Sequence, residues 1–108
     1  MTSTPRLNFQ FSPMISVNEY FNGSVKSLTL KVKGNKATCG VMEKGDYEFS
    51  TGLKEIMTVI SGQMSVKLPN SENWREFSAG EKFEVEANSK FHLKIDEDAA
   101  YLCEFIPA

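Results

Sequence analysis

The stretch Gly45–Gly62, GDYEFSTGLKEIMTVISG, decides the fold of this chain. Its first half alternates apolar and polar side chains over Tyr47–Ser50, which is typical of a half-buried strand. Its second half, Glu55–Ser61, is rich in β-branched and other apolar residues and ends at Gly62. A glycine at that position favours a tight turn into the next strand. Two strands are therefore expected, and Glu55 is a charged residue at the entrance of the second.

The same period-two alternation continues on both sides of this stretch, interrupted by turn residues. No segment shows a sustained helical period with caps. We expect strands near residues 25–32, 37–43, 47–50, 55–61, 64–68, 74–77, 83–85, 91–95 and 101–106. Many short strands at hairpin spacing predict an all-β barrel or sandwich.

Composition restricts the class of protein. A chain of 108 residues is expected to form a single domain spanning 1–108. Its net charge of −2 and lack of a basic run argue against nucleic acid or an acidic membrane as partner. Without a signal-peptide pattern or a long apolar span, we expect a cytoplasmic protein. Cys39 and Cys103 lie in apolar segments and are expected to be buried, reduced thiols.

Residues 1–15 form the least patterned segment and are expected to be an N-terminal arm or an added edge strand. They carry the large apolar side chains of Leu7, Phe9, Phe11, Met14 and Ile15 and few charges. Such a strip is more stable on a partner's sheet than in water, so we expect a homodimer formed by sheet extension or face packing.

The central stretch resembles the first motif of the cupin barrel. That motif has a glycine turn, two alternate histidines, a glutamate, six residues and another glycine. Glu55, the six-residue spacer and Gly62 match it, whereas Phe49 and Thr51 occupy the two histidine positions. The resemblance implies a single cupin-type (jelly-roll) β-barrel of short antiparallel strands.

A second cupin motif is half present. Residues 79–85 have its glycine and alternating apolar positions, and His92 lies one residue beyond the expected place of the third metal histidine. A one-residue offset in a strand reverses the face on which a side chain lies, unless a β-bulge corrects it. Glu55 and His92 would supply two ligands, fewer than the three of catalytic zinc sites or of a two-histidine, one-carboxylate triad. We therefore expect no metal and no other cofactor.

The chain as a whole resembles the pyrimidine/purine nucleoside phosphorylases, small cupin-fold proteins formerly classed as a domain of unknown function. The resemblance spans about residues 16–105 and is carried by Asn18–Gly23, Gly40–Met42, Tyr47–Thr51, Glu55–Gly62, Phe91–Leu93 and Tyr101–Cys103. It implies a pentosyltransferase of broad base specificity, which converts purine and pyrimidine nucleosides to free base and ribose 1-phosphate. Inorganic phosphate would be the co-substrate.

The chemistry of that reaction selects candidate residues. Cleavage of an N-glycosidic bond builds positive charge on ribose, which a carboxylate stabilises, so Glu55 is the first catalytic candidate. His92, a possible cation for phosphate, is the second catalytic candidate if Glu55 is only structural. Phosphate needs hydroxyl, N–H and cationic donors, for which Ser50, Thr51 and Lys94 are candidates.

The base requires a flat apolar slot, because activity on both base classes favours stacking over edge-specific hydrogen bonds. The available surfaces are Tyr47, Phe49, Met57, Phe91 and Tyr101. Each of these residues also has a purely structural interpretation as part of the core. Glu55 could likewise be held by backbone donors, and His92 could be a packed, hydrogen-bonded side chain.

Two other functions stay open at this point. One is a non-catalytic cupin that binds a sugar or nucleotide, which an assay for ribose 1-phosphate release would distinguish. The other is a metal-dependent cupin enzyme, which Phe49 and Thr51 disfavour and which elemental analysis would detect.

Overall fold

The computed structural model describes residues 14–108, which form ten strands, one short 3-10 turn and no α-helix. Alternating side chains and frequent turn residues explain why strands dominate. The elements are β1 (Val17–Tyr20), η1 (Phe21–Gly23), β2 (Val25–Val32), β3 (Asn35–Met42), β4 (Gly45–Ser50), β5 (Lys54–Ser61), β6 (Gln63–Lys67), β7 (Arg75–Ser78), β8 (Lys82–Val85), β9 (Lys90–Ile95) and β10 (Ala99–Ile106).

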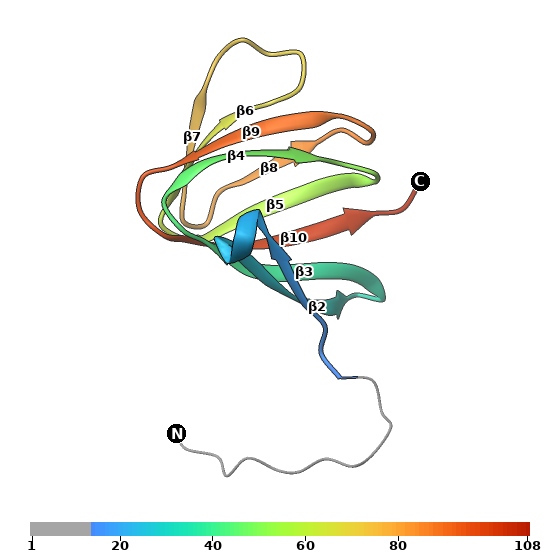
Figure 1. The fold of residues 1–108 in the computed structure, drawn as a ribbon. Coiled ribbons are helices and arrows are strands. Elements are labelled where there is room, and N and C mark those ends of the chain that lie inside the picture. The colour runs from blue at the N-terminus through green and yellow to red at the C-terminus, as the bar shows by residue number, and fades with distance from the viewer. Residues whose placement is uncertain (1–13) are drawn as a thin grey trace.

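The strands form two antiparallel sheets that face each other as two layers (Figure 1). The larger sheet has the order β1-β2-β3-β10-β5-β8, and the smaller has the order β4-β9-β6-β7. The all-β prediction is therefore confirmed. The expected single barrel is not confirmed. Within residues 14–108 the strands form two separate sheets, and the edge strands of each sheet pair on one side only.

The core lies between the two sheets, because alternate residues of each strand point inward. From the larger sheet it receives Val25, Met42, Met57, Val59, Phe83, Val85, Ala99, Tyr101 and Cys103. From the smaller sheet it receives Tyr47, Met64, Val66, Phe77, Phe91, Leu93 and Ile95. All sixteen are at most 6% exposed. In β2 the buried positions are Val25 and Ser27, whereas Leu28 and Leu30 lie on the outer face.

The turn between β5 and β6 is built as the sequence predicts. Gly62 has φ +86°, and a Cβ placed there would lie 3.0 Å from the Asp98 carbonyl oxygen. A side chain at this position would be strained by the positive φ and would also make a tight contact with backbone, so glycine is favoured here.

Three expectations need revision or fall outside the structure. Cys39 is exposed rather than buried, because it lies on the outer face of β3, whereas Cys103 is buried. Strand β1 was not expected, since only Ser16 lies between its start at Val17 and the N-terminal segment of residues 1–15. The expected arm lies outside the described residues, except for the exposed Met14 and Ile15, which belong to no strand. No described helix is long and apolar enough to cross a membrane.

Candidate functional site

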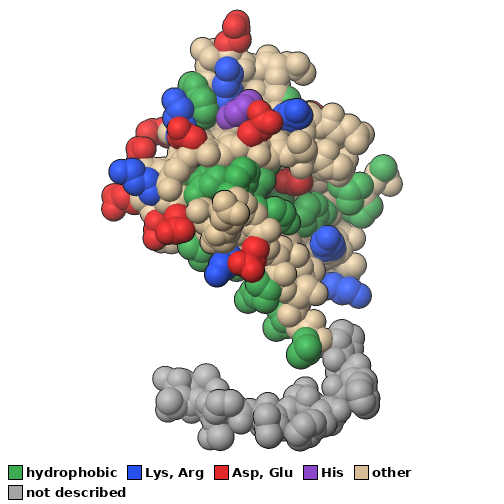
Figure 2. All heavy atoms as spheres, in the orientation of Figure 1, with side chains coloured by type: hydrophobic (Ala, Val, Ile, Leu, Met, Phe, Trp, Pro, Cys, Tyr) green, Lys and Arg blue, Asp and Glu red, His purple; other side chains and the backbone are tan. Residues whose placement is uncertain are grey.

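A pocket of about 260 Å³ opens between the sheets at the end of the sandwich where β4 and β10 finish and β3, β5 and β9 begin. Both sheets contribute to it, so the pocket exists only in the folded sandwich. Its lining comprises Tyr20, Ser27, Lys36, Thr38, Met42, Phe49, Ser50, Gly52, Glu55, Met57, Phe91, Tyr101, Cys103 and Phe105. Hydrophobic side chains gather across the middle of the face drawn in Figure 2, with charged ones around them.

Glu55 supplies the only carboxylate in this lining. It lies opposite Phe105 of β10 and Val85 of β8, and its side chain is half-buried. Burial raises the pKa of Glu55, and a hydrogen bond from the Cys103 thiol, 3.4 Å from Oε1, partly offsets this effect. A desolvated carboxylate with a single side-chain donor is a strong electrostatic partner for a positive charge inside the pocket.

Aromatic rings form one wall of the pocket. Phe49 and Phe91, paired across β4 and β9, stack with centroids 5.8 Å apart and an interplanar angle of 28°. Tyr20 meets Phe49 edge-on at 6.2 Å, and Phe21 does so at 5.4 Å. The wall is aromatic and apolar, which suits stacking with a heterocycle.

Hydroxyl groups form the opposite side. Ser27, Thr38 and Thr51 are the buried polar residues among residues 14–108, and the first two line the pocket. The Tyr101 hydroxyl lies with them; burial raises the pKa of Tyr101 to about 12, with a smaller opposite effect of Ser27 beside it. Tyr101 therefore stays protonated and can donate as well as accept.

Lys36 is the only cation among the residues that line the pocket. It extends from the start of β3, is exposed, and its Nζ lies 5.3 Å from the centre of the Phe105 ring. Phe105 is paired with Glu55, so one end of the pocket carries a cation and a carboxylate around an aromatic ring. That arrangement suits a ligand with a sugar and an anionic group.

The structure brings six of the ten predicted site residues together, namely Phe49, Ser50, Glu55, Met57, Phe91 and Tyr101. Tyr47 is in the core beside Phe49, where its hydroxyl donates to the Glu43 carbonyl at 2.6 Å.

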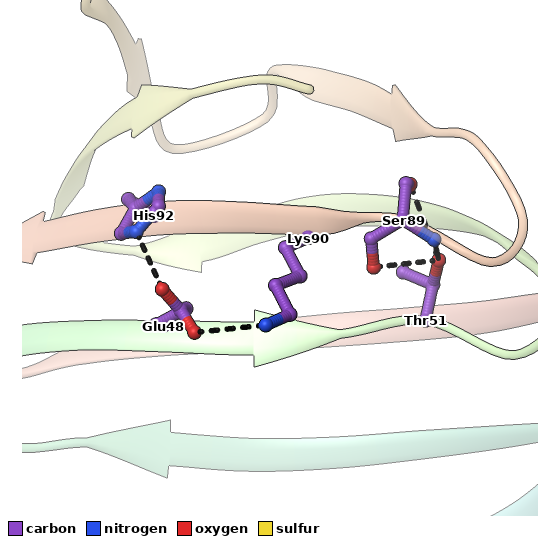
Figure 3. Close-up of polar contacts among 5 residues, drawn as sticks. All are labelled: Glu48, Thr51, Ser89, Lys90 and His92. Atoms are coloured by element: carbon purple, nitrogen blue, oxygen red, sulfur yellow. Dashed lines mark hydrogen bonds and ion pairs between the residues drawn. The ribbon is translucent and has the colours of Figure 1, made fainter. Parts of the chain in front are cut away.

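Thr51 also lies outside the lining and has a structural task. Its hydroxyl donates to the Glu86 carbonyl at 2.6 Å. It also accepts from the Ser89 backbone N–H at 3.0 Å, a contact drawn in Figure 3. These bonds tie the end of β4 to the loop before β9, so Thr51 positions the neighbouring Ser50 instead of offering its own hydroxyl.

His92 and Lys94 are not brought to the pocket. Phe91 and Leu93 point into the core, and the alternation of β9 therefore places His92 and Lys94 on the outer face of the smaller sheet. His92 Nε2 lies 2.8 Å from Glu48 Oε1 (Figure 3), and Lys94 Nζ lies 4.4 Å from the centre of the Trp74 ring. The one-residue offset noted in the sequence is thus not corrected by a bulge, and both residues are removed from this site.

The donor set bears on metal binding as well. Within residues 14–108, no three His, Cys, Asp or Glu side chains cluster closely enough to hold a metal ion. The cupin motifs offered two ligands, Glu55 and His92. Glu55 lines the pocket between the sheets, whereas His92 lies on the outer face of the smaller sheet.

A second hollow, at the other end of the sandwich, is less suited to binding a nucleoside and phosphate. Its lining has one cation, the predicted phosphate candidate Lys94, against four carboxylates, Glu76, Asp96, Glu97 and Asp98, and it contains no aromatic ring. An acidic surface of this kind repels phosphate.

Sequence reasoning missed several pocket residues, chiefly Tyr20, Ser27, Lys36, Thr38, Cys103 and Phe105. Alternation indicates which of them share a face within one strand. It does not indicate that β10 lies between β3 and β5, and that strand order is what brings Lys36, Thr38 and Cys103 next to Glu55.

Comparison with known proteins identifies the family of this chain. A family model described as pyrimidine/purine nucleoside phosphorylase matches residues 15–105. A protein of that name from Pseudomonas putida (strain GB-1) is 56% identical over 92 residues, covering 85% of this chain and 98% of its own. One from Hahella chejuensis is also 56% identical over 92 residues, covering 85% of this chain and 99% of its own.

Solved structures agree on the fold. A crystal structure of a Vibrio parahaemolyticus protein of unknown function has a TM-score of 0.83 at 42% identity, and covers 87% of this chain and 100% of its own. An RmlC-like cupin from Shewanella frigidimarina has a TM-score of 0.69 at 19% identity, covers 95% and 93%, and shows a common fold alone. The architecture is cupin-like, and the chain belongs to the pyrimidine/purine nucleoside phosphorylase family.

Proposed function

We propose that this protein catalyses phosphorolysis of purine and pyrimidine nucleosides to free base and ribose 1-phosphate without a metal. The observation that carries the proposal is the half-buried Glu55 carboxylate in a pocket with an aromatic wall and a hydroxyl-rich side. The names of the relatives support the same reaction.

In this reaction the bond between ribose C1′ and the base nitrogen breaks, and a phosphate oxygen forms the new bond to C1′. The electron pair of the broken bond leaves with the base, which takes up a proton. Positive charge grows on the ribose ring in between, and the Glu55 carboxylate stabilises it across a poorly solvated pocket. The charge is stabilised more in the transition state than in the bound nucleoside, which is what accelerates the step.

We propose that the remaining parts of a nucleoside bind to different walls of the pocket. The base stacks against Phe49 and Phe91, and a stacking wall accepts both purines and pyrimidines because every base has a π face. Ser27, Thr38 and Tyr101 offer hydroxyl groups to the ribose hydroxyls. Phosphate enters at the end marked by Lys36 and Ser50.

Metal independence is supported by the donor set of the described pocket, in which Glu55 is the only carboxylate and no histidine lies in the lining. We expect activity to survive extensive treatment with EDTA. Loss of activity with EDTA and its return with a divalent cation would instead favour a metal-dependent cupin enzyme.

The test of the proposed function is phosphate dependence. Purified protein should release uracil from uridine and a purine from inosine or adenosine only when phosphate is present, with ribose 1-phosphate formed in equal amount. Base and ribose 1-phosphate would be measured in the same sample by chromatography and a coupled assay. Equal release of base in phosphate-free buffer would identify a hydrolase. Binding of nucleoside without turnover would identify a non-catalytic binding protein.

We also propose that a second copy of the chain covers the outer face of the larger sheet. Five side chains exposed by 40–61% lie on this face, namely Val17, Leu28, Leu30, Val41 and Ile60. Glu19 and Lys26, paired at 3.7 Å, lie at its border and give the face both signs of charge. A two-fold contact uses the same patch on both copies, so an apolar centre with a mixed border is self-complementary.

Light scattering at micromolar concentration should therefore report a dimer, and Leu28→Lys should shift it to a monomer. Leu53→Lys is the matched control, because Leu53 is 44% exposed in the loop between β4 and β5, away from this face. A monomeric wild-type protein would contradict the proposal.

A further inference from the structure

Cys103 is a buried thiol beside the candidate catalytic carboxylate, and the reaction as described does not use it. Its side chain is in the core, and the residue is 4% exposed. Its Sγ lies 3.4 Å from Glu55 Oε1 and donates to that oxygen. Among residues 14–108, no other side chain hydrogen-bonds Glu55.

The register of three strands produces this contact. Cys103 of β10 lies opposite Thr38 of β3 on one side and opposite Met57 of β5 on the other. Glu55 is two residues before Met57, on the same inward face of β5, and is therefore a diagonal neighbour of Cys103. Both side chains line the pocket, so the thiol and the carboxylate share one environment.

We propose that Cys103 is a positioning residue: its thiol holds the Glu55 carboxylate toward the pocket and tunes the basicity of that carboxylate. The proposal rests on the proposed function for the role of Glu55. Cys103 itself touches the carboxylate and acts through it.

The properties of a thiol suit this task. Burial raises the pKa of Cys103 well above its usual range, with the neighbouring Glu55 carboxylate acting in the same direction. The side chain therefore remains a neutral S–H and donates. A thiol is a weak donor, so it orients the carboxylate while neutralising little of its charge. A hydroxyl in its place would donate more strongly and would make the carboxylate less basic.

Few other titratable groups share the pocket with Glu55. Tyr101 comes from β10, Lys36 from β3 and Tyr20 from β1, while β4, β5, β8 and β9 contribute no further titratable group to the lining. Cys103 is the one that contacts the carboxylate in a hydrogen bond. Its replacement is therefore expected to change the titration of Glu55 directly.

The decisive experiment compares Cys103→Ser with Cys103→Ala, because serine and alanine differ only by the hydroxyl. The pKa of the Glu55 carboxyl would be measured in each folded, ligand-free protein by carbon-detected NMR. We expect the value in the serine variant to be lower than in the alanine variant by about one pH unit, since a hydrogen bond to the charged form favours ionisation. The wild-type value should lie between the two.

Cys39→Ser and Cys39→Ala are the matched controls. Cys39 lies on the neighbouring strand, opposite Leu102 and on the outer face, so neither change should move the Glu55 titration. Equal Glu55 pKa values in the two Cys103 variants would overturn the proposal. If Cys103→Ala fails to fold, Cys103→Ser against wild type decides the question by the same measurement, and an unchanged value overturns it.

Turnover gives a second measurement. In the phosphorolysis assay the acid limb of the pH profile of kcat/KM should move to lower pH in Cys103→Ser and to higher pH in Cys103→Ala. The NMR titration uses no substrate, so it decides the role of Cys103 even if the protein is not a phosphorylase. A failure of the proposed function and a failure of this proposal are therefore distinguishable.

Discussion

Glu55→Gln is expected to reduce kcat/KM for phosphorolysis by roughly 10²–10³, the usual effect of removing one preorganised electrostatic partner of a transition state. Glutamine keeps the volume and an acceptor oxygen, so the Cys103 contact and the packing at the start of β5 should survive. What it lacks is the full negative charge, which the positively charged ribose of the transition state requires. The measurement is steady-state phosphorolysis with uridine and with inosine.

The thermal stability of Glu55→Gln should not fall with its activity. Burial raises the pKa of Glu55, so the folded protein binds the Glu55 proton more tightly than the unfolded chain does. The contribution of Glu55 to the free energy of unfolding is therefore fully present below the ordinary glutamate pKa. It is lost as the pH rises through the raised pKa that Glu55 has in the folded protein. Glutamine never ionises and avoids that loss, so the Tm of the variant at neutral pH should equal or exceed that of the wild type.

The control is Glu104→Gln. Glu104 is the partner of Ile56 in the same sheet but is absent from the pocket lining, so its loss should leave kcat/KM within a few fold. A Glu55→Gln variant with near wild-type turnover and a lowered Tm would make Glu55 a structural carboxylate.

Lys36→Gln is expected to lower kcat/KM for phosphate by about tenfold, with a smaller effect on nucleoside binding. A charge-assisted contact to phosphate supplies enough energy for a tenfold change even after screening by solvent, and Lys36 is exposed. Initial rates would be measured over a matrix of phosphate and nucleoside concentrations, so that the two KM values separate.

Lys26→Gln is the matched control, because Lys26 lies on the adjacent strand and pairs with Glu19 at 3.7 Å outside the pocket. High salt should reduce the difference between Lys36→Gln and wild type but not that between Lys26→Gln and wild type. Equal phosphate KM values in wild type and Lys36→Gln would exclude Lys36 from the phosphate site. Ser50 would then be the next residue to test for phosphate binding.

The sequence by itself was enough to locate nine of the strands and to identify Glu55 as the candidate carboxylate. Nine strands were expected within one or two residues of their observed limits, because alternation at period two is a local property. Glu55 was recognised because a charge at the start of an apolar strand is unusual, and it does line the pocket. The six predicted pocket residues come from inward positions of strands or from the loop end of β4, which alternation and turn residues reveal.

Tertiary structure decided which surfaces those strands share. The sequence placed His92 near a metal position, but only the packing of Phe91 and Leu93 into the core shows that His92 faces outward. Lys36, Thr38 and Cys103 reach Glu55 because β10 inserts between β3 and β5. Strand order joins segments far apart in the chain, and its energy comes from burying whole sheet faces against each other, so no local pattern of residues encodes it.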